Sequence, residues 1–83
     1  PEAERVTDLV IRHLRTRPET SLGIIAFNQS QQSAIEDAIY ERRRKYPEVE
    51  ALFHTGLSEP LFVKNLENVQ GDERDIIILS MGY

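Results

Sequence analysis

The chain has 83 residues, no cysteine and a net charge of −4 at pH 7. This length suits one small domain with a modest core, because a chain this short buries only about 60–65% of the surface that it exposes when unfolded. The lack of cysteine excludes disulfides and thiolate metal sites, and neither histidine has a second ligand at a suitable spacing. The acidic balance argues against an autonomous nucleic-acid binder, but it is compatible with a lobe that adds a few contacts to a shared site. Without a long apolar stretch or a signal peptide, we expect a cytoplasmic protein with no membrane partner.

The first part of the chain predicts a helix followed by a strand. Residues 2–17 show an amphipathic helical pattern that ends at Pro18, because proline disfavours helix in the residue before it. The apolar side chains expected to face inward are Ala3, Val6, Leu9, Val10 and Leu14. Residues 22–27 form a continuous apolar run with β-branched side chains, which is typical of a strand buried on both faces.

A second helix is predicted over residues 29–45. Asn28 and Gln31 have the spacing of a capping box, and the basic run 42–45 places cations where the helix dipole favours them. The side chains expected to face inward are Ile35, Ala38 and Ile39. The aromatic side chains expected to pack beneath the helix are Tyr40, Tyr46 and Phe53. Pro47 is expected to break the chain before a short helical turn.

Two more strands are predicted at residues 61–64 and 75–80, joined by a connector built around Gly71. Strands and helices in this order indicate the α/β fold class with a parallel sheet. Ligands bind such sheets beyond the carboxyl ends of the strands. Segments 28–31 and 65–74 qualify, since both are rich in amides or charges. From the residues alone, however, a helix cap and a tight turn explain the two segments more simply.

A family resemblance adds to this interpretation. Residues 63–83, VKNLENVQGDERDIIILSMGY, closely resemble motif V of superfamily 1 helicases, which has a strand, a polar and an acidic residue, Gln-Gly-x-Glu, Asp, and an apolar strand ending in Ser. The matching residues are Asn65, Glu67, Gln70, Gly71, Glu73, Asp75 and Ser80. Residues 23–33, GIIAFNQSQQS, resemble motif IV, with Gln31 at the family's glutamine. The opening helix resembles the one that precedes motif IV.

The resemblance implies that residues 1–83 are a piece of the second RecA-like lobe, which has a three-layer fold of the P-loop NTPase type. It is nearest to the branch of the nonsense-mediated-decay helicase and, within it, to large bacterial helicase-like proteins that are often fused to a Vsr-type endonuclease domain. Pro1 is not an initiator methionine, and Tyr83 directly follows an apolar run. We therefore expect both ends to be boundaries of a piece of a larger protein.

The family's site residues transfer onto matching positions of this sequence. The resemblance assigns nucleotide binding to Asn28, Gln31, Gly71 and Glu73, with the Glu73 carboxylate near the ribose. It assigns coupling between the nucleotide and the nucleic-acid backbone to Asn65 and Gln70. Asn65 stands where the family commonly has threonine. Glycine at position 71 would let the backbone approach the ligand closely.

By the same resemblance, the parent protein is an ATP-dependent DNA or RNA helicase or translocase. It would use ATP and Mg²⁺, and the first RecA-like lobe of the same chain would be its partner. The phosphate loop G-x-x-x-x-G-K-[ST] and the acidic Mg²⁺ motif do not occur in these residues, and the arginine finger of motif VI is expected beyond Tyr83. We therefore expect the isolated chain to be inactive, and to self-associate through uncovered apolar strands.

A different class of function stays open: a non-catalytic α/β scaffold, derived from a helicase, for protein interaction or nuclease positioning. An intact phosphate loop upstream and an Arg-bearing motif VI downstream would distinguish the motor from the scaffold. Simpler interpretations also stand for single residues. These are Gly71 as a turn glycine, Glu73 and Arg74 as a solvated charge pair, residues 42–45 as a solvated helix end, and His54 as exposed and without a role.

Overall fold

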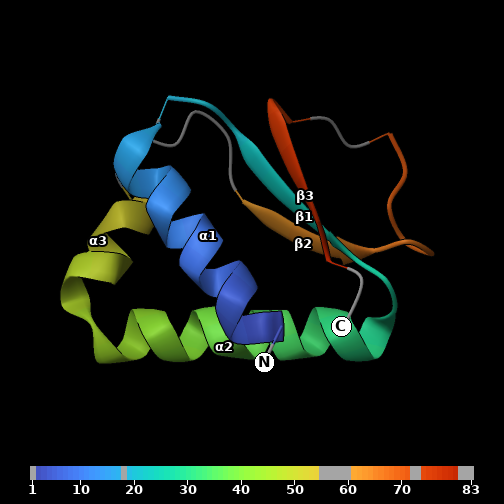
Figure 1. Cartoon of the computed structure of the whole chain (residues 1–83), viewed down its shortest axis with the longest axis horizontal. Helices are drawn as coiled ribbons and strands as arrows, with labels where there is room; N and C mark the ends of the chain where they lie inside the picture. Colours follow the sequence, from blue (N-terminus) through green and yellow to red (C-terminus); the bar gives the residue numbers. More distant parts are fainter. Residues whose placement is uncertain (1, 18, 55–60, 72–73, 81–83) are drawn as a thin grey trace.

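The computed structural model describes residues 2–17, 19–54, 61–71 and 74–80. In chain order its elements are α1 (Glu2–Thr16), β1 (Leu22–Ala26), α2 (Gln29–Lys45), α3 (Pro47–His54), β2 (Phe62–Asn65) and β3 (Ile76–Ser80). The strands form one parallel sheet in the order β2-β1-β3, with β1 in the middle (Figure 1). The predicted α/β fold class with a parallel sheet is confirmed.

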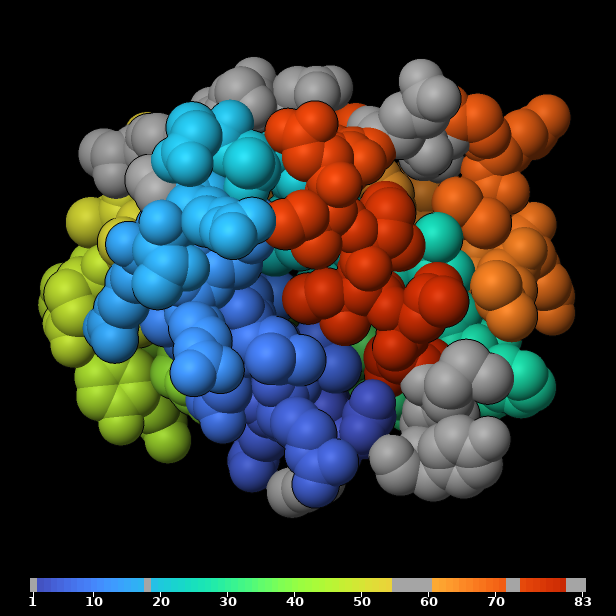
Figure 2. Space-filling view, turned by 45° about the horizontal axis from the view of Figure 1, so that its top comes forward, coloured from blue at the N-terminus to red at the C-terminus, as the bar shows by residue number. Residues whose placement is uncertain are grey.

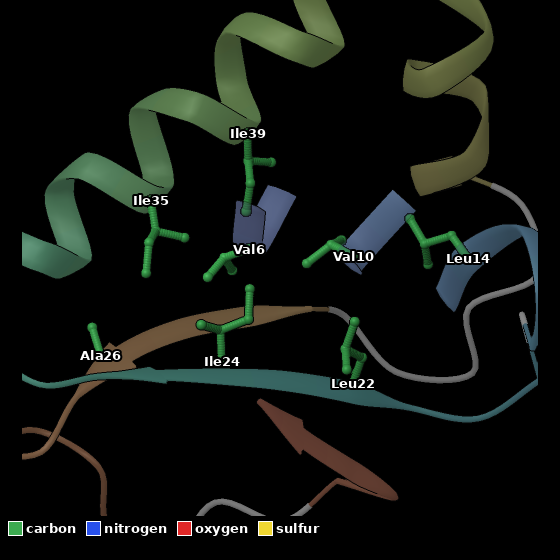
Figure 3. Packing of buried hydrophobic residues seen from close by; sticks show 8 residues of the cluster. All are labelled: Val6, Val10, Leu14, Leu22, Ile24, Ala26, Ile35 and Ile39. Carbon is green, nitrogen blue, oxygen red and sulfur yellow. The ribbon is translucent and has the colours of Figure 1, made fainter. Parts of the chain in front are cut away.

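The core lies between the sheet and the helices. Figure 3 shows its eight central side chains pointing into one layer between β1 below and the helices above: Val6, Val10, Leu14, Leu22, Ile24, Ala26, Ile35 and Ile39. One of the positions predicted to face inward is wrong, because Leu9 is 42% exposed. Thr7 and Ile11 are buried instead. At 100° per residue, Leu9 lies roughly 130° from the centre of the buried stripe, so it turns to solvent.

Helix α2 has the predicted bounds, and its start is capped as expected. The Oδ1 atom of Asn28 accepts a hydrogen bond from the backbone N–H of Gln31 at 2.8 Å. The second half of the predicted capping box is wrong, because the Gln31 side chain points elsewhere, as shown below. Pro47 is the first residue of α3, so the short helical turn expected after it begins at the proline itself. Proline suits the first turn of a helix, where its missing N–H costs nothing.

The aromatic residues around α2 do not pack as predicted. Tyr40 and Tyr46 are 64% and 47% exposed, because the buried stripe of α2 consists of Ile35 and Ile39 and each tyrosine lies off it. Phe53 does pack against the core, with the Arg43 guanidinium 4.4 Å from its ring centre. The strands also start or end one residue away from their predicted bounds.

The helices of the described chain cover one face of the sheet only, so two layers of the predicted three are present (Figure 1). On the covered face, Ile76 and Ile78 pack against the core. On the open face, Ile77 is 38% and Leu79 is 64% exposed, so β3 is covered on one side and leaves apolar side chains uncovered, as predicted. Among the described residues, no helix is long and apolar enough to cross a membrane.

Candidate functional site

The three strands end at one edge of the sheet, because they are parallel. Their last residues form a single row: the register pairs Ala26 of β1 with Asn65 of β2 and with Ser80 of β3. Helix α2 starts at this edge, three residues after β1 ends. In open parallel sheets ligands bind at this carboxyl edge, and of the predicted site residues Asn28, Gln31 and Asn65 lie there.

Gln31 reaches across to the end of β3. Its Nε2 atom donates to the Ser80 hydroxyl at 2.8 Å, and that hydroxyl donates to the Glu2 carboxylate at 3.0 Å. Ser80 is 1% exposed, so the middle of this chain of bonds is buried, while Gln31 and Glu2 at its ends are partly exposed. It ties the starts of α1 and α2 to the end of β3. Gln31 is therefore held by a partner at the carboxyl edge and is still partly exposed.

Gln32, which was not among the predicted site residues, contacts the end of β2 on the other side of β1. Its Nε2 atom donates to the carbonyl of Val63 at 3.0 Å, and its Oε1 atom accepts from the Asn65 side chain at 2.7 Å. The two adjacent glutamines thus bind the two outer strands, Gln31 to β3 and Gln32 to β2. The sequence feature that could have predicted this arrangement is the pair of consecutive glutamines in the first turn of a helix. Neighbouring positions of a helix point to different sides, so the two side chains can reach different strands.

Asn65 is a buried structural residue. It is 2% exposed, and its Oδ1 atom accepts from the backbone N–H groups of Glu67 and Asn68 at 2.9 and 3.1 Å. Its side chain therefore closes the turn that follows β2, and its amide group faces Gln32. An asparagine supplies the acceptor for such a turn and, on the same side chain, the donor for Gln32.

Two of the remaining predicted residues, Gln70 and Gly71, lie in the connector between β2 and β3. Gly71 has a left-handed φ of +67°, and a Cβ atom placed on it would meet nothing within 4 Å. The backbone conformation therefore favours glycine, as the turn interpretation predicted, while the space beside it is open. Gln70 is exposed and precedes this turn. Glu73 lies outside the described residues, and Asn28 is exposed and caps α2.

The basic run at the end of α2 forms ion pairs instead of a free patch. Arg42 bonds Asp8 at 2.9 Å, Arg43 bonds Glu50 at 2.6 Å, and the third arginine bonds its neighbour Glu41. The prediction of a solvated helix end fits Arg44, whose side chain is 57% exposed, but not Arg42 and Arg43, whose side chains are 28% and 33% exposed. Hydrogen bonds from Arg43 and then His54 lower the pKa of Glu50 from 4.5 to about 2.

His54 is exposed, as predicted, but it is not without a role, since its Nε2 atom lies 2.6 Å from the Glu50 carboxylate. Arg74, predicted to be half of a solvated pair, stacks its guanidinium 5.0 Å from the ring centre of Phe62. Across the described ranges, no group of three or more His, Cys, Asp or Glu side chains is placed to hold a metal ion.

Comparison with known proteins places the chain in a family. A family model described as an AAA domain matches residues 1–82. The chain belongs to this AAA domain family. It is 51% identical, over 65 residues, to the "Uncharacterized ATP-dependent helicase MG140" of Mycoplasma genitalium, a match that covers 76% of this chain and 6% of the relative.

The homologue of that protein in Mycoplasma pneumoniae is 46% identical over 67 residues, which are 78% of this chain and 6% of the relative. The chain thus spans about 6% of the length of the curated relatives that it matches. No solved structure matches the chain significantly.

Proposed function

We propose that this chain is part of an ATP-dependent helicase or translocase of superfamily 1, and that its carboxyl edge contributes to the ATP site between two RecA-like lobes. The observation that carries the proposal is the row Ala26–Asn65–Ser80, where the ends of all three strands meet the first turn of α2. That edge is the ligand-binding edge of parallel α/β sheets. Membership of the AAA domain family and two relatives named as ATP-dependent helicases support an ATP-driven reaction.

The residues divide into a nucleotide group and a coupling group. For the nucleotide we propose Asn28, Gln31, Gly71 and Glu73. Open space beside Gly71 supports this proposal, because it leaves room for a ligand to approach the backbone. ATP would supply the phosphoryl group, and Mg²⁺ would neutralise the charge of the ATP phosphates. The ligands for the metal would come from other parts of the parent.

The coupling group consists of Asn65 and Gln70, and the side chains of Gln31 and Gln32 connect it to the strand ends. Because Gln31 binds the end of β3 and Gln32 binds the end of β2, a displacement of the start of α2 would move both outer strands together. Asn65 passes such a movement to the turn that leads to Gln70 and Gly71. We therefore assign Asn65 a positioning role, acting through the turn, between the nucleotide and the nucleic acid of the parent.

The test is a steady-state ATPase assay on the full-length parent, with and without single-stranded DNA or RNA. The proposal predicts hydrolysis that nucleic acid stimulates, and a KM for ATP that rises about tenfold in Gln31→Ala, as expected for losing one hydrogen bond to a charged ligand. Gln29→Ala is the matched control, because Gln29 is exposed on the same turn. A parent without ATPase activity under any of these conditions would be a scaffold, and the proposal would be wrong.

A further inference from the structure

A groove lies on the helical side of the molecule, away from the sheet. It has a volume of about 590 Å³ and runs between α1 and the junction of α2 and α3. Its lining comes from helix residues and from Tyr46, which joins the two later helices. In Figure 2 the blue surface of α1 adjoins the lime-green surface of this junction. The groove is thus built by packing between helices and is separate from the strand ends.

The groove is also remote from the candidate nucleotide site. Helix α1 ends at Thr16, shortly before β1 begins, so its last turns lie beside the amino ends of the strands. Helix α2 starts at the carboxyl edge and has 17 residues, which carry its far end about 25 Å away. Figure 1 shows the end of α2 and the whole of α3 on the side opposite the start of α2. A ligand here would leave the carboxyl edge free.

The composition of the groove is that of a binding surface. Ile11 and Val49, which are 7% and 4% exposed, form an apolar floor. Arg12 and Arg15 line it on α1, and Tyr46, which is 47% exposed, lines it on the other side. Arginine and tyrosine over an apolar centre are the residue types enriched in protein interfaces and in their strongest contacts.

The charges indicate an acidic ligand. Arg12 and Arg15 take part in none of the ion pairs between described residues, whereas Arg42, the third arginine of the groove, is neutralised by Asp8. Two guanidinium groups outside these ion pairs therefore stand over the apolar floor of the groove. They would attract carboxylates or phosphates.

Two features favour a polypeptide over nucleic acid. Asp8 is paired with Arg42, but Glu48 also lines the groove and would repel a phosphodiester backbone, which carries a negative charge at every unit. A peptide can place its carboxylates at Arg12 and Arg15 alone. The floor is apolar and suits a leucine or phenylalanine side chain, which a phosphodiester backbone cannot supply. We propose that the groove binds an acidic polypeptide segment that carries apolar anchor residues. This inference does not depend on the function proposed for the carboxyl edge.

Fluorescence anisotropy on the 83-residue chain tests the proposal. The probe is a short labelled peptide with leucine and phenylalanine anchors among glutamates, and a matched peptide has serine at the anchor positions. The groove variant is Arg12→Glu with Arg15→Glu. The control variant is Arg5→Glu with Arg17→Glu, which makes the same charge change at exposed arginines outside the groove. Circular dichroism of both variants serves to check that they keep the fold.

The proposal predicts that the groove variant binds the probe at least about tenfold more weakly, because two attractive pairs become repulsive, while the control variant changes binding by less than about twofold. The serine peptide should also bind more weakly to the unchanged chain. Equal losses in the two variants would show attraction to net charge only and would overturn the proposal. So would tighter binding of a labelled single-stranded oligonucleotide than of the peptide, or no binding of the peptide at all.

Discussion

Replacing Asn65 by alanine should destabilise the chain more than any other change of an amide side chain at the carboxyl edge. The side chain makes three hydrogen bonds: one to the Gln32 side chain and two from the backbone of the turn at Glu67 and Asn68. A typical hydrogen bond contributes about 0.5–1.5 kcal/mol net. Glu67 and Asn68 are exposed, so water can replace part of what their N–H groups lose.

We therefore expect Asn65→Ala to lower the free energy of unfolding by about 2 kcal/mol, nearer the lower end of the range for three bonds. In a domain of this size that loss lowers the melting temperature by roughly 10 °C. Gln32→Ala should cost less. The double variant should cost about 1 kcal/mol less than the sum of the two single changes, because both remove the same bond.

Urea and thermal unfolding followed by circular dichroism, at low protein concentration, measure these losses. Gln29→Ala is the control for removing a glutamine from the first turn of α2, and it should change stability by less than about 0.5 kcal/mol. Two results would contradict this account: a free energy of unfolding of Asn65→Ala within about 0.5 kcal/mol of the control, or a loss in the double variant equal to the sum of the two single losses. Either would mean that the bond between Asn65 and Gln32 does not hold the strand end to α2.

Three further outcomes follow from the structure. Hydrogen bonds lower the pKa of Glu50 to about 2 in the folded chain, so the stabilisation that they give is present above pH 4.5 and is lost as the pH falls towards 2. The melting temperature of Glu50→Gln should therefore lie below that of the unchanged chain at pH 6, and the two should converge near pH 2. Glu48→Gln is the control. Light scattering should show self-association of the isolated chain at high concentration, reduced in Leu79→Lys because Leu79 is exposed on the open sheet face; a monomer under those conditions would contradict this. Calorimetry should find ATP binding by the isolated chain no tighter than about millimolar, with no turnover above a buffer blank, because the sequence lacks a phosphate loop.

Local patterns predicted most of the fold. Helix α2 was placed to the residue, because Asn28 is a strong cap and the apolar positions Ile35 and Ile39 recur at helical spacing. Short runs of apolar side chains located all three strands, and those of β1 and β3 are rich in isoleucine, which suits a buried sheet. Periodicity cannot decide which neighbouring apolar residue faces the core when the stripe is wide. For that reason Leu9 is wrongly predicted to face inward, and the buried Ile11 is missed.

The candidate site was predicted only where local chemistry determines it. The cap at Asn28 and the turn at Gly71 follow from the preferences of single residues. The contacts of Gln31 with Ser80 and of Gln32 with Asn65 join residues 49 and 33 positions apart. Such contacts depend on strand order, which a single sequence does not reveal. The buried state of Asn65 could not be predicted for the same reason.

The most direct test of the central claim is the effect of Glu73→Gln on ATP hydrolysis by the full-length parent, with nucleic acid at saturation. If the Glu73 carboxylate receives the ribose hydroxyls, the amide should lower kcat/KM about ten- to a hundred-fold, since a hydrogen bond to a charged group contributes about 1.5–3 kcal/mol. The loss should shrink with a nucleotide analogue that lacks both ribose hydroxyls, because the partner is already absent. Unchanged kinetics in Glu73→Gln with ATP would contradict the assignment of this edge to the nucleotide site.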